Sequence, residues 1–269
     1  MSNLKNKYGQ TALIAGASEG LGAAFATALA IHGFDLVLVA RRIEPLEQLA
    51  SKLLATYNIK IKTITCDLAD KNATEQILAQ LENIEIDFLV YNACMSYIGP
   101  YLKSSIEDQI KIVDVNINTP MRMLHAFGSK MTQRKRGAVV IMASMAGLQG
   151  SGYLSTYGAS KAFNKIFAEG IWYEWKNKGV DVIACCAGAT ATPNYLNTTP
   201  KKTSIFEPKA QAPEEVVKEC LSKIGKTPSF ISGTSNKLAT FFMQKLFPRK
   251  LAINTMGDTA KKMYDIDDK

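Results

Sequence analysis

Long apolar runs, paired cysteines and histidine clusters are missing from this 269-residue sequence. No stretch approaches the roughly 18 consecutive apolar residues that suggest a membrane-spanning helix, and residues 1–10 lack the apolar core of a signal peptide. The five cysteines form no C-x-x-C pair, and neither they nor the two histidines have the spacing of a metal site. These absences predict a cytoplasmic protein with reduced thiols and no metal.

Acidic residues are fewer than basic ones. The net charge is +8, and residues 201–269 alone carry 13 basic and 8 acidic residues. Such a balance favours anionic ligands or a basic, solvated surface. The sequence has no arginine-rich or aromatic pattern of the kind that binds nucleic acid, so we expect no nucleic-acid partner.

Short β-rich runs alternate with helical patterns along most of the chain. This alternation predicts a single α/β domain with a doubly wound, Rossmann-type parallel sheet of about seven strands. The expected strands are Thr11–Ala15, Leu36–Ala40, Lys60–Thr65, Phe88–Tyr91, Ala138–Ala143, Asp181–Ala187 and Ser229–Ile231. The expected helices are Leu21–His32, Pro45–Tyr57, Ala73–Leu81, Ile106–Met131 and Tyr153–Trp175.

A glycine-rich turn, Gly16 to Gly22, joins the first expected strand to the first helix. Glycines let a backbone approach a pyrophosphate closely, and a helix N-terminus offers free N–H groups to it. In this position the turn predicts that residues 1–234 form a dinucleotide-binding catalytic domain. A tight turn without a ligand is the alternative.

The end of the second strand indicates which dinucleotide binds. An NAD site usually has an acidic residue there, but Asp35 precedes the strand, and Arg41 and Arg42 follow it. A guanidinium group suits the 2′-phosphate of NADP(H). Glu19 in the glycine turn would oppose that phosphate if it pointed inward.

Three polar residues follow the fifth strand. Ser144 lies at the strand's carboxyl end, where open α/β sheets bind their ligands. Tyr157 and Lys161 are four residues apart on an expected helix and therefore share one face. An ordinary helix face with a buried ring and a solvated amine is the alternative.

Several further features have the spacing of one known family. Thirteen residues separate Ser144 from Tyr157, and the glycines follow a G-x-x-x-G-x-G pattern. Matching positions elsewhere are Asp67, Asn92–Ala93, Asn116, Gly188 and Thr192. About residues 9–195 therefore resemble the short-chain dehydrogenase/reductases. Ala15, Cys94 and Ala187 depart from the pattern, since threonine, glycine and proline are common there.

The resemblance implies an NADPH-dependent carbonyl reductase or alcohol dehydrogenase. Tyr157 would be the acid/base, Ser144 would hold the substrate oxygen, Lys161 would lower the pKa of Tyr157, and Asn116 would hold a relay water. The implied NADP(H) contacts are Gly16, Ser18, Gly20, Leu21, Gly22, Arg41, Arg42, Asp67, Leu68, Asn92, Ala93, Tyr157, Lys161, Gly188, Thr190 and Thr192. A homodimer or homotetramer is implied too. The competing hypothesis is a non-catalytic NADP-binding sensor or scaffold of the same fold.

Apolar residues surround the expected reactive group. Met145, Tyr153 and Leu154 lie between Ser144 and Tyr157, and Tyr195 lies in a polar segment, about residues 190–213, that we expect to form a lid with Ile205 and Phe206. Such a lining favours a hydrophobic ketone, aldehyde or 3-oxoacyl substrate. Family members that act on steroids or 3-oxoacyl chains look similar.

Residues 235–269 form an expected helical extension. Its large apolar residues recur at helical spacing beside basic ones and predict an amphipathic helix that Pro248 ends. The apolar stripe is Leu238, Phe241, Phe242 and Leu246, and the basic residues are Lys237, Lys245, Arg249 and Lys250. We expect the stripe to pack on the same domain or on a second subunit. A peripheral contact with a membrane surface is the alternative.

Overall fold

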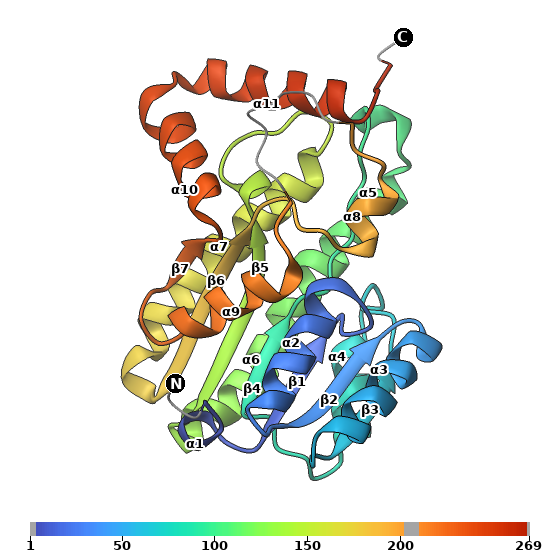
Figure 1. Cartoon of the computed structure of the whole chain (residues 1–269), viewed down its shortest axis with the longest axis vertical. Helices are drawn as coiled ribbons and strands as arrows, with labels where there is room; N and C mark the ends of the chain where they lie inside the picture. Colours follow the sequence, from blue (N-terminus) through green and yellow to red (C-terminus); the bar gives the residue numbers. More distant parts are fainter. Residues whose placement is uncertain (1–3, 202–209, 268–269) are drawn as a thin grey trace.

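A seven-stranded, fully parallel sheet runs through the centre of the molecule (Figure 1). The computed structural model describes residues 4–201 and 210–267. The strand order is β3-β2-β1-β4-β5-β6-β7. The strands are β1 (Thr11–Ala15), β2 (Asp35–Ala40), β3 (Ile61–Thr65), β4 (Phe88–Tyr91), β5 (Gly137–Ser144), β6 (Val180–Ala187) and β7 (Ser229–Ile231). The predicted doubly wound α/β fold is confirmed.

The central strands are buried on both faces, which explains their nearly continuous apolar sequences. All five residues of β1 are buried, as are all four of β4. The chain order reverses between β1 and β4: β2 and β3 lie on one side of β1, and β4 and the later strands lie on the other. A crevice at the carboxyl ends of the strands at such a reversal is the usual ligand site of open α/β sheets.

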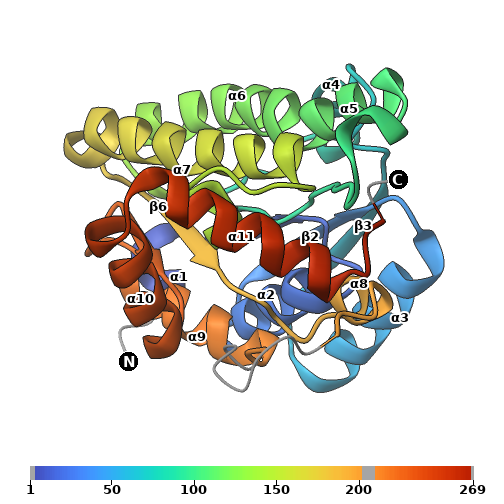
Figure 2. The ribbon, with the colours of Figure 1, turned by 90° about the horizontal axis from the view of Figure 1, so that it is seen from above.

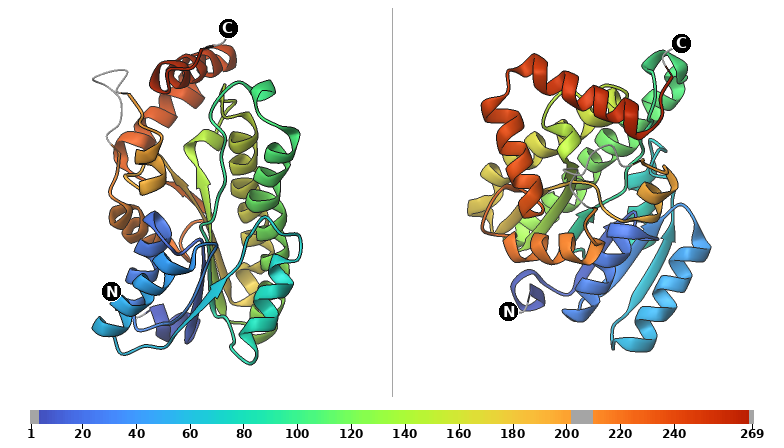
Figure 3. Two further views of the ribbon diagram at one scale, coloured as in Figure 1. Left: turned by 90° about the vertical axis from the view of Figure 1, so that its right-hand side faces the viewer. Right: turned by 45° about the horizontal axis from the view of Figure 1, so that its top comes forward.

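Helices cover the two faces of the sheet as separate layers, which the left view of Figure 3 shows edge-on. One layer is α1 (Leu4–Tyr8), α2 (Gly20–Ile31), α3 (Ile43–Thr56) and α9 (Pro213–Lys223), and the other is α4 (Ala73–Leu81), α6 (Thr119–Arg134) and α7 (Ser155–Trp175). Each layer forms its own hydrophobic core with one face of the sheet. The short helices α1 and α9 have no counterpart among the helices expected from the sequence.

The predicted helix Ile106–Met131 is helical throughout and ends at Arg134, but it is not a regular α-helix. The segment is divided into α5 (Ile106–Val113), a π-helical turn η2 (Asp114–Asn118) and α6. A π-turn holds one more residue than an α-turn and is frequent at functional sites. Here the wider turn contains Asn116, which is fully buried.

The C-terminal segment forms a helical hairpin above the carboxyl ends of the strands. It consists of α10 (Thr234–Phe241), a π-helical turn η5 (Phe242–Leu246) and α11 (Arg249–Met263). Figure 2 shows α11 crossing the end of the sheet between α7 and α8 (Pro193–Asn197). Short 3-10 turns occur at η1 (Tyr101–Lys103), η3 (Met145–Gly147) and η4 (Lys176–Lys178).

The extension contacts the rest of the domain, but its apolar stripe does not. Gln244 donates to the Leu148 carbonyl oxygen at 3.2 Å, and a methyl group on Gly152 would lie 3.2 Å from Gly257 Cα. The stripe is largely exposed, so the expectation that it packs on the same domain is not met, while packing on a second subunit stays a prediction. Leu238, Phe241, Phe242 and Leu246 are between 44% and 59% exposed. The inward positions carry small or polar side chains instead, among them Asn236, Thr240 and Ala252.

Two features bear on the expected lid and on membranes. Thr190 and Gln211 pair as an isolated parallel bridge, which joins the two ends of the expected lid. Residues 202–209, with Ile205 and Phe206, lie outside the described residues. Within residues 4–201 and 210–267, no helix is long and apolar enough to cross a bilayer.

Candidate active site

The glycine turn between β1 and α2 has the form of a phosphate cradle. Gly16 has φ +81°, a conformation that favours glycine, and a side chain there would lie 2.7 Å from the Ala93 backbone. A side chain on Gly22 would collide with the Gly16 carbonyl oxygen. The residue before α2, Glu19, does not cap the helix with its side chain. The first N–H groups of α2 are therefore free to bind an anion.

Residues that follow two other strands, β4 and β6, meet this turn. Asn92 Nδ2 donates to the Gly16 carbonyl oxygen at 2.9 Å, and Ala93 is the backbone neighbour just described. Thr192, after β6, lies against Gly20, where an added methyl group would be 2.8 Å from its Cγ2 atom. The structure thus brings together parts of the predicted cofactor set that are far apart in the sequence. A dinucleotide pyrophosphate fits this cradle.

The end of β2 presents two arginines that differ in their contacts. Arg42 forms a 2.6 Å ion pair with Glu19, and both side chains are exposed. Arg41 is also exposed and forms no ion pair with any residue in the described part of the chain. Asp35 lies at the opposite end of β2, where its carboxylate accepts from Lys60 N and Gln10 Nε2. No acidic side chain from β2 is therefore placed to bind a ribose.

The remaining cofactor candidates lie at the same edge of the sheet. Asp67 follows β3 and accepts from Ala69 N, while the Leu68 carbonyl oxygen accepts from Thr119. Thr190 is buried and donates to the Gly188 carbonyl oxygen at 3.1 Å. Ser18 and Leu21 belong to the glycine turn and the first turn of α2. Their contacts with a cofactor stay a prediction.

Ser144, Tyr157 and Lys161 form one connected group between β5 and α7. The side chains of Tyr157 and Ser144 are hydrogen-bonded to each other. Lys161 is 2% exposed, and its Nζ donates to the Met142 carbonyl oxygen at 2.9 Å. The same Nζ lies 5.7 Å from the centre of the Tyr157 ring. The ordinary helix-face alternative is excluded for Lys161, because its ammonium group is buried.

Burial dominates the electrostatics of this group. It raises the pKa of Tyr157 well above the ordinary value, with a further contribution from the Cys94 thiol, while the Ser144 hydrogen bond acts in the opposite direction. Burial also lowers the pKa of Lys161. Whether Lys161 lowers the pKa of Tyr157 together with an oxidised nicotinamide stays a prediction. The protein by itself holds Tyr157 in its neutral, proton-donating form.

Asn116 ties the reactive helix to the loop after β4. Its Oδ1 accepts from Met95 N at 2.8 Å, and its Nδ2 donates to Met95 O and to Ser160 Oγ, both at 2.9 Å. Ser160 in turn donates to the Tyr157 carbonyl oxygen at 2.7 Å. Both ends of the Asn116 side chain are thus held by protein groups, and its role toward a relay water stays a prediction.

Ser160 is a residue that the sequence reasoning missed. It is 1% exposed and lies between Tyr157 and Lys161 in the same helix. Serine is an unremarkable helix residue when exposed, so only its position beside the Tyr-x-x-x-Lys pair could have suggested a role. Its hydroxyl links Asn116 to the helix turn that carries Tyr157.

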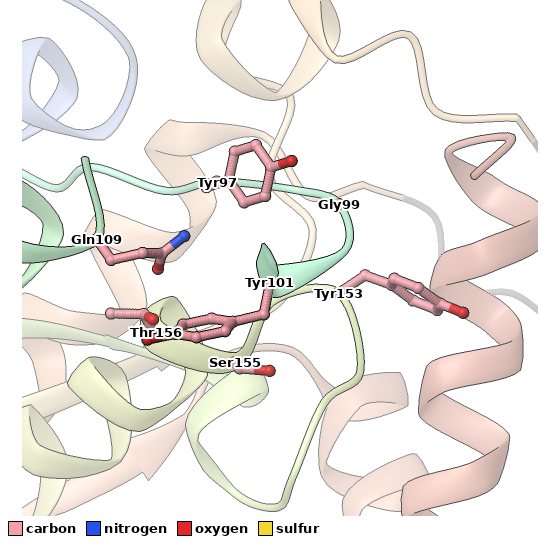
Figure 4. A pocket seen from close by; sticks show the side chains of 7 residues that line it. All are labelled: Tyr97, Gly99, Tyr101, Gln109, Tyr153, Ser155 and Thr156. Carbon is pink, nitrogen blue, oxygen red and sulfur yellow. The ribbon is translucent and has the colours of Figure 1, made fainter. Parts of the chain in front are cut away.

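Figure 4 shows a small pocket lined by aromatic and polar side chains, to which residues 153, 155 and 156, just before Tyr157 in the sequence, contribute. Its lining residues are Tyr97, Gly99, Tyr101, Gln109, Tyr153, Ser155 and Thr156. Tyr153 has φ +63°, which is rare for a bulky residue, and its carbonyl oxygen accepts from Gly99 N at 2.9 Å. In Figure 4 its ring points away from the other labelled side chains, toward the red C-terminal helix. This backbone conformation directs Tyr153 toward α11, the helix above the carboxyl ends of the strands, which we call the roof.

The other expected substrate residues border the same region. Met145 begins η3, directly after Ser144, and Leu154 immediately precedes α7. Tyr195 lies in α8, where its N–H group donates to the Thr192 side chain at 3.2 Å. Whether these residues contact a substrate stays a prediction. No cluster of metal-ligating side chains occurs among the residues that the structure describes.

The fold and site define an oxidoreductase of the Rossmann type, and comparison with known proteins gives the family. A sequence model described as short chain dehydrogenase matches residues 10–203. The chain therefore belongs to the short-chain dehydrogenase family, as the sequence motifs predicted. Its relatives are dehydrogenases and reductases, and the chain is an enzyme acting on CH–OH groups.

Relatives of two kinds stand out. A 7beta-hydroxysteroid dehydrogenase of Mediterraneibacter gnavus is 36% identical over 87% of this chain and 90% of its own. A very-long-chain 3-oxoacyl-CoA reductase of Anas platyrhynchos is 30% identical over 95% of this chain and 81% of its own. The predicted similarity to steroid and 3-oxoacyl members is confirmed.

Solved structures agree with these relatives. One from work on 7beta-hydroxysteroid dehydrogenase stereoselectivity has a TM-score of 0.89 at 33% identity and covers 94% of this chain and 99% of its own. A short-chain dehydrogenase from Sphingobium yanoikuyae, in complex with NADPH, has a TM-score of 0.74 at 27% identity and covers 83% of this chain and 87% of its own.

The hydrogen bonds that Ser160 makes with Asn116 and with the Tyr157 carbonyl oxygen give a testable prediction. Ser160→Ala removes the hydroxyl that accepts from Asn116, which leaves a buried N–H donor unpaired. Such a loss costs about 1–3 kcal/mol in the free energy of unfolding, measurable by urea denaturation. We also expect kcat to fall while the KM for the dinucleotide changes little. Ser51→Ala on the exposed side of α3 is the control. Wild-type stability and kcat in Ser160→Ala would contradict this prediction.

Proposed function

We propose that this enzyme is an NADP(H)-dependent hydroxysteroid dehydrogenase with Tyr157 as its acid/base. The observation that carries the proposal is the Tyr157 hydroxyl, hydrogen-bonded to Ser144 beside the buried Lys161. This arrangement holds a proton donor where an apolar carbonyl compound would meet the nicotinamide. A homo-oligomer, a cytoplasmic location and a division into a catalytic part (1–234) and an extension (235–269) stay predictions.

The mechanism follows from the state of each group. A bound nicotinamide supplies or accepts the hydride. The Ser144 hydroxyl donates a hydrogen bond to the substrate carbonyl oxygen and so fixes it beside Tyr157. In reduction the Tyr157 hydroxyl then gives its proton to that oxygen as the oxygen gains negative charge, a transfer that contributes about 10²–10⁴-fold. Lys161, a positive charge 5.7 Å from the ring centre, stabilises the phenolate that remains.

Oxidation reverses these roles. Tyr157 must then begin as a phenolate, although burial opposes that form. The positive charge of an oxidised nicotinamide beside the ring favours the phenolate, so the base forms mainly when the cofactor is in place. We infer that the protein alone favours reduction at neutral pH.

The cofactor proposal rests on Arg41. Arg41 is exposed directly after β2, and Asp35 is at the wrong end of the strand to bind a ribose hydroxyl. Arg42 neutralises Glu19 and so removes a negative charge that would repel a 2′-phosphate. NADPH in the Sphingobium yanoikuyae relative supports the same choice.

The substrate proposal follows the named relatives. A steroid is the first candidate, because a 7beta-hydroxysteroid dehydrogenase is 36% identical over 87% of this chain. A 3-oxoacyl thioester is the second candidate, favoured by the avian relative. The two differ in shape, because an acyl chain is flexible and needs a long groove.

A substrate panel with one variant tests the activity. NADPH oxidation should be measured by absorbance with steroids that carry an oxo group at different ring positions, with 3-oxoacyl thioesters and with simple bulky ketones. We expect turnover with an oxosteroid, and a drop of about 10²–10⁴-fold in Tyr157→Phe with NADPH binding retained. Absence of steroid turnover would refute the substrate, whereas a Tyr157→Phe rate above about a tenth of wild type would refute the acid.

Cofactor choice has its own pair of variants. Arg41→Ala should weaken NADPH binding by about ten- to a hundredfold, the worth of a charged hydrogen bond, and leave NADH binding nearly unchanged. Arg42→Ala should weaken NADPH binding too, since it leaves Glu19 unneutralised, and Glu19→Gln in that background should restore it. Fluorescence titration measures each Kd. Equal losses for both dinucleotides would point to a structural role for Arg41.

The pH dependence follows from the raised pKa of Tyr157. Reduction needs the protonated hydroxyl, so its rate should stay flat from about pH 6 to about pH 9 and fall only at higher pH. Oxidation needs the phenolate, so its rate should rise with pH over the same range. Steady-state rates at saturating cofactor and substrate in both directions measure this. A reduction rate that falls with a midpoint near neutral pH would show that burial does not hold this proton.

A further inference from the structure

The outer face of the C-terminal hairpin carries an apolar patch that no other part of the described chain covers. The patch spans α10, η5 and the start of α11, and its six large side chains are between 39% and 59% exposed. They are Leu238, Phe241, Phe242, Leu246, Phe247 and Leu251. We call this set the hairpin patch. Contiguous exposed apolar surface of this kind usually marks a site of interaction.

The hairpin that carries the patch is fixed to the domain by its other side. Lys237 forms a 2.6 Å ion pair with Glu219, and Asn236, buried, donates to the Ser232 carbonyl oxygen at 2.8 Å. Farther along, Ile253 packs against Gly150, where an added methyl group would lie 3.4 Å from it. The patch therefore points outward from an anchored segment.

The segment that carries the patch has charged residues of positive sign only. Residues 234–257 contain four basic residues and no Asp or Glu. Lys237 is neutralised by Glu219, but Lys245, Arg249 and Lys250 are exposed and form none of the ion pairs found among the described residues. Three free cations thus lie within or beside a group of exposed aromatic and leucine side chains.

Two occupants can be compared for such a surface. A second copy of the chain docked across a two-fold axis would bring each patch, with its three cations, against an identical one. Like charges would then face each other at a desolvated contact, which is unfavourable. An anionic bilayer surface instead offers phosphate groups to the cations and an apolar layer to the rings. Basic amphipathic helices with aromatic and leucine residues bind such surfaces.

We propose that the hairpin patch docks this enzyme on the surface of a bilayer that contains anionic phospholipid. Phe241, Phe242 and Leu246 enter the boundary between headgroups and acyl chains, while Lys245, Arg249 and Lys250 bind lipid phosphates. The contact is peripheral, because the patch lies on one face of an anchored hairpin. The hairpin stands above the carboxyl ends of the strands (Figure 3, right), so docking turns the site-bearing end of the molecule toward the membrane. This inference does not rest on the proposed substrate.

Vesicle sedimentation with the full-length protein tests the proposal. One set of vesicles is phosphatidylcholine alone, and the other contains roughly one-third phosphatidylglycerol, an anionic lipid. We expect binding to the anionic vesicles at least about tenfold tighter than to the neutral ones, and weaker at high salt. Equal binding to both kinds, or none to either, would overturn the proposal.

Two variants separate the apolar and the charged contributions. Phe241→Ser with Phe242→Ser removes two rings, and Lys245→Gln, Arg249→Gln and Lys250→Gln together remove the free cations. Each set should weaken binding to anionic vesicles by at least about tenfold. The matched controls, which should bind like wild type, are Ile31→Ser with Ile166→Ser, and Lys52→Gln with Lys71→Gln and Lys130→Gln, all at exposed positions.

Two readouts keep the result unambiguous. Thermal unfolding should be unchanged in every variant, because the substituted side chains are exposed. Sedimentation velocity without lipid should give the same molecular mass for wild type and the Phe241→Ser/Phe242→Ser variant. A lower mass in that variant with vesicle binding intact would identify the patch as an interface between copies and overturn membrane docking. Loss of binding in the charge variant alone would also overturn it, because the rings would then play no part.

Discussion

The hydrogen bonds of Asn116 hold the reactive centre together. One amide side chain joins the π-helical turn η2, the loop after β4 and helix α7 through three contacts of 2.8–2.9 Å. The loop after β4 carries Ala93, which lies against the glycine turn, and α7 carries Tyr157 and Lys161. These hydrogen bonds therefore link the helix that carries Tyr157 and Lys161 to the loop that lies against the glycine turn. An apolar side chain at position 116 would leave Met95 and Ser160 without their partner.

Burial and charge act against each other around these hydrogen bonds. Burial favours the neutral forms of both Tyr157 and Lys161, which would leave the site with little charge of its own. The Lys161 ammonium is held by a backbone carbonyl oxygen and not by a carboxylate. No negative charge from that hydrogen bond therefore cancels its effect on the tyrosine. The positive charge needed for the phenolate is available to the ring instead of being consumed in an ion pair.

The sequence predicted those features that depend only on neighbouring residues in the chain, such as buried strands, glycine turns and residues on one helix face. Continuous apolar runs located β1 and β4 to the residue, because strands buried on both faces need such runs. The motif residues were found because close approach to a phosphate demands glycine and because residues four apart share a helix face. Ser160 was missed, since a buried serine and an exposed one look alike in a sequence. The π-helical turn at Asn116 was missed because the apolar and polar residues around it recur at the spacing of an ordinary α-helix.

Other features depend on contacts that no local pattern contains. Arg41 and Arg42 are neighbours of the same type, yet Glu19, over twenty residues away, engages only one of them. The stripe in the C-terminal segment was correctly placed on one side of a helix. That it does not face its own domain was not predicted, because amphipathicity shows that a helix has two faces and not which of them meets the protein. The positive φ of Tyr153 likewise follows from its place between the Gly99 loop and α11.

The roof formed by α11 separates two tasks along the chain. Groups that would carry out the hydride and proton transfers lie between Gly16 and Thr192, whereas α11 shapes the space above them from residues 249–263. Ile253 and the backbone of Gly257 lie closest to Gly150 and Gly152 in the loop below it. Substitutions in α11 can reshape the entrance while the reaction chemistry is left intact. Over evolutionary time, such an arrangement lets one set of catalytic residues acquire selectivity for new substrates through changes in a short terminal segment.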